Sequence, residues 1–261
     1  MTHKLNGIFT AHLGLTLFFL YGPIVVLAIL SFNDSGLATA WGGFSLKWYV
    51  ALANNSKIIL ATINTLIVAS VTTLIATVIG TMLAMGVERL RKSPWLDGLL
   101  FAPLVVPDIV LAIGLLSFFT TIHMKLGLHS IVMAHVVFNI AFVCAVVRTR
   151  LDNFDHSLLE ASTDLGASTW TTFRRVTLPV IFPGVFGAAL LAFTLSFDEF
   201  TIAFFTAGTK QSSTTLPMQI YSMIKFGVKP DINALATIIM GVSFILVFFA
   251  QKFNREAIFG R

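Results

Sequence analysis

A polar segment interrupts an otherwise apolar part of the chain at Glu160-Ala161-Ser162-Thr163-Asp164-Leu165-Gly166. After nine more residues, Val176-Thr177-Leu178-Pro179 leads into the next apolar stretch. The stretches on either side, residues 128–147 and 180–202, are rich in Val, Ile, Leu, Phe and Ala. Each is long enough to cross the roughly 30 Å hydrocarbon core of a bilayer as a helix. The pattern predicts a membrane protein whose residues 149–179 fold outside the bilayer.

The composition of the whole chain also favours a membrane location. Of 261 residues, 56% are hydrophobic and 11% are charged, whereas soluble domains carry about 25% charged residues. The net charge of +5 does not indicate nucleic acid binding, because the basic residues border the apolar stretches and form no stripe with interleaved aromatic residues. Cys144 is the one cysteine, which excludes an internal disulfide and a cysteine metal cluster.

Six apolar stretches are long enough to be transmembrane helices. The third contains Asp108 and prolines at 103 and 107, which predict a bend or a re-entrant start. The first exceeds the 7–15 residues or so of a signal-peptide core, so we expect a retained anchor. The sequence thus predicts an all-α membrane protein with a single domain over residues 1–261. The expected spans are residues 13–32, 62–86, 98–121, 128–147, 180–202 and 233–251.

The distribution of Lys and Arg predicts the orientation of the chain. An even number of spans places both termini on one side, and the side with more basic residues is the inside. With the N-terminus inside, internal segments hold eleven basic residues, all eight arginines among them, and external segments hold six. We therefore expect both termini in the cytoplasm. Residues 149–179 would then be cytoplasmic, and the external segments 33–61 and 203–232 are long enough to dock a partner.

The cytoplasmic loop is predicted to fold as a helix-turn-helix knob. Asp155 is a candidate N-cap of a first short helix. Gly166 stands where that helix would end in a left-handed turn, which glycine adopts without strain. Ser168 can cap a second short helix that carries Trp170 and Phe173.

The far end of the knob is marked by charges and prolines. Arg174 and Arg175 would lie near the C-terminal, dipole-negative end of the second helix. Pro179 and Pro183 are expected to prevent this helix from merging smoothly into the next span. From composition alone, the loop fits equally well an amphipathic segment lying on the lipid headgroups.

The spacing within this loop resembles the EAA loop of bacterial ATP-driven importer permeases. That pattern is Glu-Ala-Ala, three residues, Gly, nine residues and Ile-x-Leu-Pro. Here Glu160-Ala161 begins the pattern, Gly166 follows after the required spacing, and Leu178-Pro179 ends it. The chain departs at Ser162, which replaces the second alanine, and at Val176, which replaces isoleucine.

The resemblance extends over nearly the whole chain. The region from 62 to 251 resembles the five-helix core of type I importer permeases, the MetI-like fold, in its length and in the pairs Asn64-Thr65 and Pro107-Asp108. Other segments are similar more narrowly to the spermidine/putrescine branch, second permease subunit, of that family. These segments are residues 196–199, 215–218, 220–223, 227–228 and 233–237.

The family resemblance implies a set of partners and a location. It implies a second homologous permease subunit, two cytoplasmic ABC ATPase subunits and an extracytoplasmic substrate-binding protein, all at the bacterial inner membrane, with no cofactor in this chain. The implied cargo is a polyamine, spermidine or putrescine. Relatives of this branch also move ferric iron, sulfate, phosphonates or opines, which are the alternative cargoes.

The resemblance and the chemistry of the residues together give three sets of candidate site residues. For coupling to the ATPase they are Glu160, Ala161, Ser162, Asp164, Leu165, Gly166, Ala167, Trp170, Leu178 and Pro179. For the substrate path they are Asp198, Glu199, Asp108 and Phe197. For contact with the binding protein they are Leu216, Pro217 and Tyr221, although Tyr221 fits an interfacial aromatic anchor equally well.

The carboxylates of the substrate path need a physical reason, because acids within a membrane are costly. Counted from Phe182, Asp198 and Glu199 lie roughly 24–26 Å from the inner face, toward the outer mouth. Asp108 lies roughly 15 Å into a regular helix, near mid-depth. Such acids can replace the water of a cationic polyamine in passage. The alternative is that Asp198 and Glu199 cap or pair locally and that Asp108 caps the helix after Pro107.

Two other features have simpler interpretations. His135 and Asn139 are four residues apart and share one helix face, which favours interhelical hydrogen bonds. Ser243, after Gly241, would give an intramembrane hydrolase its nucleophile, with His135 as the base, but such a serine usually packs between helices.

The sequence contains no zinc hydrolase motif and no Gly-x-x-x-x-Gly-Lys-Ser/Thr phosphate loop, so we expect a transport subunit and not an enzyme. A secondary transporter is the remaining rival. Such a protein would more often show inverted repeats, and it would have no use for a coupling knob.

Overall fold

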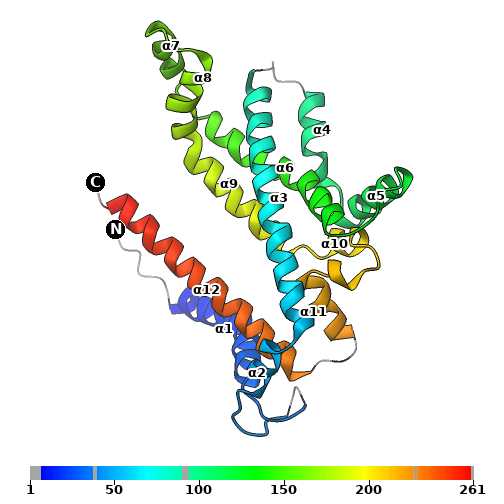
Figure 1. Cartoon of the computed structure of the whole chain (residues 1–261). Coiled ribbons are helices and arrows are strands. Elements are labelled where there is room, and N and C mark those ends of the chain that lie inside the picture. Colours follow the sequence, from blue (N-terminus) through cyan, green and yellow to red (C-terminus); the bar gives the residue numbers. More distant parts are fainter. Residues whose placement is uncertain (1–6, 38–39, 90–93, 226, 228, 260–261) are drawn as a thin grey trace. The chain divides into compact units, whose positions relative to one another are not determined.

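The computed structural model describes residues 7–37, 40–89, 94–225, 227 and 229–259, apart from the side chains of residues 8, 89, 94 and 245–259. Most of the described residues are helical (Figure 1). The chain divides into two compact units, residues 1–59 with 220–261 and residues 60–219. Each unit is described by itself.

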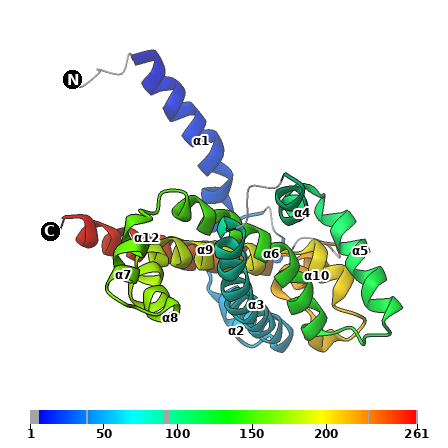
Figure 2. The ribbon, with the colours of Figure 1, turned by 90° about the horizontal axis from the view of Figure 1, so that it is seen from above.

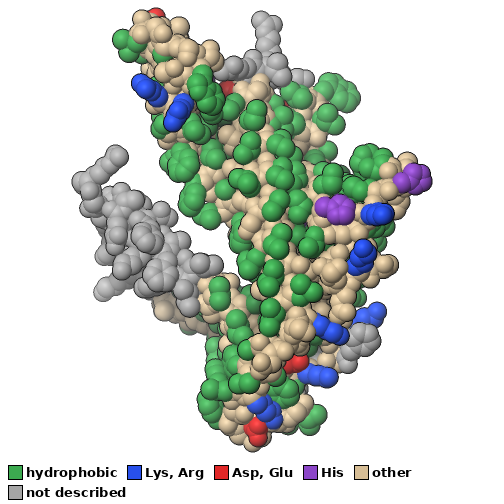
Figure 3. Space-filling model, viewed as in Figure 1, with side chains coloured by type: hydrophobic (Ala, Val, Ile, Leu, Met, Phe, Trp, Pro, Cys, Tyr) green, Lys and Arg blue, Asp and Glu red, His purple; other side chains and the backbone are tan. Residues whose placement is uncertain are grey.

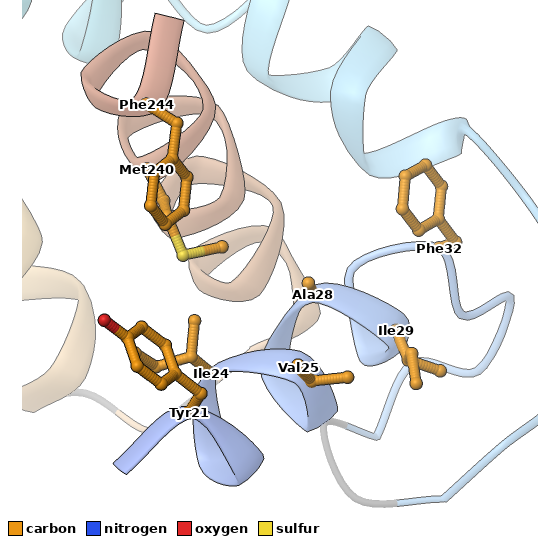
Figure 4. Close-up of a pocket in the computed structure, with 8 residues that line it drawn as sticks. All are labelled: Tyr21, Ile24, Val25, Ala28, Ile29, Phe32, Met240 and Phe244. Carbon is orange, nitrogen blue, oxygen red and sulfur yellow. The ribbon is translucent and has the colours of Figure 1, made fainter. Parts of the chain in front are cut away.

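The first unit is built from α1 (Gly7–Leu30), α2 (Lys47–Ala53) and α12 (Pro230–Phe259), and α12 packs against both of the others. Between α1 and α12 lies a cavity of about 330 Å³ with an almost wholly apolar lining (Figure 4). Tyr21 enters it from α1 and Phe244 from α12.

The loop after α1 is organised by Asn33. Its Oδ1 accepts hydrogen bonds from Ser35 N and Gly42 N, and its Nδ2 donates to Leu37 O and Ala40 O. A buried amide with all these bonds made is a stable centre for a loop, because none of its polar groups is left without a partner.

An ion pair closes the same loop. Asp34 Oδ1 lies 2.8 Å from Lys47 Nζ, at the start of α2. The hydrogen bond and the charge of this lysine lower the pKa of the Asp34 carboxyl. Because both side chains are exposed, the pair contributes little to stability.

The second unit is a bundle of long helices centred on α6 and α9, which lie side by side (Figures 1 and 2). α3 (Ser56–Arg89) enters this unit at residue 60 and approaches α6 closely, since a Cβ at Gly80 would lie 2.7 Å from Val143. Small residues allow such contacts between membrane helices.

The helices of this unit after α3 are α4 (Pro94–Val105), α5 (Asp108–Thr121), α6 (Leu128–Leu151), α7 (Ser157–Asp164), α8 (Thr169–Thr172), η1 (Phe173–Thr177), α9 (Leu178–Asp198), α10 (Thr201–Thr206), η2 (Gln211–Ser213) and the start of α11 (Leu216–Lys225).

The core of the second unit consists mainly of small and β-branched residues from α3, α6 and α9. They include Ala76, Val143, Val147, Ile181 and Ala188. The outward faces are also apolar, as hydrophobic side chains cover much of α3 and α9 in Figure 3. An exposed apolar face on a long helix is expected where lipid, and not water, is the solvent.

An ion pair joins α4 to α6. Arg148 Nη1 donates to Asp97 Oδ1 at 2.6 Å, and the guanidinium lies over the Phe101 ring, 5.4 Å from its centre. The charge of Arg148 is therefore matched inside the unit.

The helices can be compared with the six expected spans. Among the described residues, four helices are long and apolar enough to cross a membrane, or five if one bent pair counts as a span. The bent pair is α4 and α5, which meet at 102°, so the bend predicted from Pro103 and Pro107 is confirmed. The sixth expected span, 233–251, lies on α12, and the side chains of its last residues are outside the described set.

Candidate functional site

The knob between α6 and α9 is a pair of short helices, α7 and α8, at the end of the second unit (Figure 1). The turn after α7 is a Schellman motif. Gly166 N donates to Thr163 O at 2.8 Å, and Ala167 N donates to Ser162 O at 3.1 Å. Gly166 has φ +75°, so the left-handed conformation predicted for this glycine is confirmed.

Both short helices begin at a polar side chain. Ser168 Oγ accepts a hydrogen bond from Thr171 N, which confirms the predicted cap of α8. Asp155 lies one residue before His156, the N-cap position of α7, and not at the cap itself. Its Oδ1 nevertheless accepts from Ser157 N at 3.0 Å. The hydrogen bonds from Ser157 lower the pKa of the Asp155 carboxyl.

The two helices of the knob are tied together by Ser162. Its Oγ lies 2.8 Å from Thr172 Oγ1, and the residue is 9% exposed. An alanine at this position, as in the EAA pattern, could not make this bond, so the departure at Ser162 adds a contact and does not weaken the turn.

The knob presents apolar side chains to its surroundings. Leu165 is 88% exposed, and Trp170 is 67% exposed and packs against Phe173 at 5.4 Å between ring centres. Of the other coupling candidates, Glu160, Ala161, Asp164 and Pro179 are exposed, and Ala167 and Leu178 are half-buried.

The knob continues into α9 without interruption. α8, the π-helical segment η1 and α9 follow one another, and residues 169–198 form one run of 30 residues. The prediction that Pro179 and Pro183 would separate the second knob helix from the next span is therefore wrong. The helical run is continuous, and a π-helical segment lies at the junction. The wider π turn lies before Pro179, whose ring would otherwise clash with the carbonyl of Arg175.

The far end of α9 holds two adjacent acids in different surroundings. Asp198 is the last residue of α9 and is exposed. Glu199 is extended and its side chain is 10% exposed. Its Oε1 accepts from Ile202 N at 2.6 Å and its Oε2 from Ala203 N at 2.8 Å, so it binds the first turn of α10 from one residue before Phe200, the N-cap position. For Glu199, the structure therefore agrees with the alternative prediction, that these acids cap or pair locally.

Of the remaining path candidates, Phe197 directly precedes Asp198 on α9, whereas Asp108 lies on another helix, α5. Phe197 is half-buried, with its ring stacked at 6.0 Å on Phe193. Asp108 is exposed in the first turn of α5, directly after the 102° bend. The predicted depth of Asp108, near the middle of the membrane, assumed a regular helix. Because α4 and α5 meet at a sharp bend just before this residue, that prediction does not hold. The backbone N–H groups of this turn favour a negative charge there.

His135 makes the predicted interhelical contact. Its Nδ1 lies 2.7 Å from Ser196 Oγ on α9. Its Nε2 lies 3.2 Å from Glu199 Oε2, a contact that helix-face arguments could not reveal. Asn139 instead donates to the carbonyl of His135 within α6, at 3.0 Å.

The buried Asn64-Thr65 pair, in the first half of α3, fixes the segment that leads into α11. Asn64 Nδ2 donates to the carbonyls of Ser212 and Thr214, and Thr65 Oγ1 accepts from Leu216 N at 2.7 Å. Leu216 is consequently 3% exposed, so it contributes to packing in this chain.

The other two candidates for contact with the binding protein are more accessible than Leu216. Pro217 is half-buried and Tyr221 is 46% exposed on the same helix. Among the described residues, no group of three His, Cys, Asp or Glu side chains is arranged to hold a metal.

Several apolar helices, a sharply bent pair and a helical hairpin outside the spans define a multi-pass membrane protein. The chain belongs to the family of binding-protein-dependent transport system inner membrane components, whose model matches residues 76–255. It is therefore a permease subunit of an ABC importer at the inner membrane, and not an enzyme.

Two relatives resemble the chain over most of its length. It is 40% identical over 240 residues to the spermidine/putrescine transport system permease protein PotC of Escherichia coli (strain K12), covering 91% of this chain and 90% of that protein. It is 39% identical over 241 residues to the putrescine transport system permease protein PotI of the same strain, covering 89% and 85%.

Solved structures show the same fold at low identity. A bacterial ABC transporter involved in the import of the acidic polysaccharide alginate gives a TM-score of 0.76 at 17% identity, covering 96% of this chain and 94% of that one. A structure of the alginate transporter in complex with alginate pentasaccharide-bound periplasmic protein gives 0.72 at 18%, covering 96% and 93%.

Proposed function

We propose that this permease subunit forms part of the passage for a polyamine, spermidine or putrescine, delivered by an extracytoplasmic binding protein. The observation that carries the proposal is the identity of about 40% with polyamine permeases across nine-tenths of the chain. The exposed carboxylate of Asp198 supports it, because a cationic cargo that leaves water needs negative charge along its route.

The α7–α8 knob is the part that couples this passage to ATP hydrolysis. Its exposed Leu165 and Trp170 offer an apolar contact to a cytoplasmic ATPase subunit, and its turn is held rigid by Gly166 and Ser162. Two such ATPase subunits and a second homologous permease complete the assembly. ATP binding closes the ATPases around the knobs and turns the helices outward-facing, and hydrolysis resets them.

The orientation that fits this role places both termini in the cytoplasm. All eight arginines then fall on the cytoplasmic side. The whole chain acts as one transmembrane domain, and the family match from 76 to 255 includes parts of both compact units. Pro217 and Tyr221 lie on the external side in this orientation, where the binding protein docks.

The decisive experiment measures ATP hydrolysis by the complete assembly in vesicles with its binding protein. Spermidine and putrescine are compared with ferric iron, sulfate, a phosphonate and an opine, each as the added cargo. Stimulation by the two polyamines alone is the expected result. Stimulation by one of the other solutes, with none by polyamines, would refute the proposed cargo but not the importer role.

A further inference from the structure

The two acids at the end of α9 are not equivalent. Asp198 is exposed, whereas the side chain of Glu199 is 10% exposed and directs both oxygens at the first turn of α10. Glu199 is therefore engaged by backbone N–H groups of Ile202 and Ala203. A carboxylate bound in this way offers little of its charge to a passing cation.

His135 touches the chain on both sides of the break between α9 and α10. Its Nδ1 lies 2.7 Å from Ser196 Oγ, in the last turn of α9, and its Nε2 lies 3.2 Å from Glu199 Oε2, after the break. The imidazole is 1% exposed. One ring from α6 thus links residues three apart, across the point where the helix ends.

Neighbouring groups hold the imidazole in this position. Phe138 lies beside it, 5.6 Å between ring centres, and Asn139 Nδ2 donates to the His135 carbonyl. Ser196 is 2% exposed and Asn139 is fully buried. His135 Nε2 and Asn139 Oδ1 are buried and make no hydrogen bond among the described residues, so the ring is held by its Nδ1 bond to Ser196, by Phe138 and by the approach of Nε2 to Glu199.

We propose that His135 is a positioning residue for cargo passage. By holding Glu199 against α10, it fixes the break so that Asp198 is the one acid of the pair that faces the cargo. The inference rests on the proposed function, since it requires a cationic cargo to pass Asp198. Without the imidazole, Glu199 keeps its two backbone N–H partners on α10 but loses the side-chain contact that joins it to α6. The segment between α9 and α10 is then no longer fixed to α6, and the carboxylate of Asp198 changes its position.

Two substitutions of His135 form a matched pair. In His135→Gln the amide can reach the place of Nε2 and keep the contact with Glu199. In His135→Asn the shorter amide reaches the place of Nδ1 and keeps only Ser196. Uptake of radiolabelled putrescine and ATP hydrolysis are measured in vesicles with the complete assembly and its loaded binding protein.

The readout is the amount of putrescine moved per ATP hydrolysed. We expect the Gln variant to stay within about twofold of the unmodified protein and the Asn variant to fall about tenfold, the size of a lost contact between coupled residues. A merely structural role would lower assembly, hydrolysis and uptake together and leave the ratio unchanged. Equal ratios in the two variants, or an unchanged ratio in the Asn variant, would overturn the inference.

A second arm asks whether His135 acts through Asp198. Asp198→Asn is combined with His135→Asn, and the double variant is expected to be no worse than Asp198→Asn alone. If the two losses multiply, the two residues act independently. That result would overturn the inference about His135 but would leave the proposed function standing. If the unmodified assembly moves no putrescine, the proposed function fails, and the inference fails with it.

Discussion

The knob and the α9–α10 break lie at opposite ends of one helical run, and their polar side chains find partners at different distances along the chain. In the knob, Ser168 bonds to Thr171 and Asp155 to Ser157, partners only two or three residues away and near the surface. At the break, His135 contacts a residue 61 positions away and is buried. Local, exposed bonds can be replaced by water, whereas buried bonds between helices cannot.

Gly166→Val is expected to have the largest effect, because the knob depends on one backbone conformation more than on any side-chain bond. At φ +75° a side chain costs about 1–2 kcal/mol, and more when it is β-branched. We expect ATP hydrolysis stimulated by loaded binding protein to fall about thirtyfold, the equivalent of 2 kcal/mol or so. Gly166→Asn should retain most of the activity, since asparagine tolerates this conformation.

A control for that test is Gly187→Ala on α9, where the added methyl group meets no atom within 4 Å. It should leave stimulated hydrolysis unchanged. If Gly166→Val were equally harmless, the knob would not need its left-handed turn.

Asp198→Asn tests the other end of the run. Loss of a charged partner for the cargo should lower polyamine uptake about tenfold, the size of one charge-assisted hydrogen bond, while the subunits still assemble. Uptake and the recovery of the complex are measured together. Asp34→Asn removes an exposed acid that pairs with Lys47 and should change uptake less than twofold or so. Normal uptake by Asp198→Asn would remove Asp198 from the path.

Ser168→Ala should have a smaller effect, confined to the knob. Loss of the cap costs about 1 kcal/mol, which corresponds to roughly fivefold faster hydrogen exchange at the amide of Thr171. Ser168→Asp should keep the protection, since aspartate is an equally good cap. Equal exchange in both variants would show that this bond does not stabilise α8.

The smallest expected effect is a pH dependence at Asp155. Its pKa is lowered in the folded knob, so its contribution is complete above the ordinary aspartate pKa of about 4 and disappears as the pH falls through the lowered value. The protection of the Ser157 amide, which is the slowing of its exchange relative to that of an unstructured chain at the same pH, should fall over that range. Asp155→Asn should remove this dependence, and an unaltered profile would exclude Asp155 as its source.

The same contrast explains what the sequence could predict. The turn at Gly166 and the cap at Ser168 depend on residues within a few positions, so local patterns revealed them. The bend at Pro103 and Pro107 was also predictable, because prolines disrupt a helix wherever they lie. Its angle of 102° was not predictable, and the estimated depth of Asp108 failed for that reason.

Contacts between helices were predicted only as far as one helix face. The pairing of His135 with another helix was expected, but Ser196 and Glu199 could not be named without the packing of α6 on α9. The π segment η1 was also missed, since its hydrogen bonds depend on how the chain accommodates Pro179.

The π segment Phe173–Thr177 has a geometric consequence for the whole run from Thr169 to Asp198. Thirty helical residues span about 45 Å, and each residue turns the helix by about 100°. A wider turn near one end therefore sets the azimuth of every side chain beyond it. The direction in which the terminal aspartate points is decided some twenty residues earlier, where five residues wind more loosely than their neighbours.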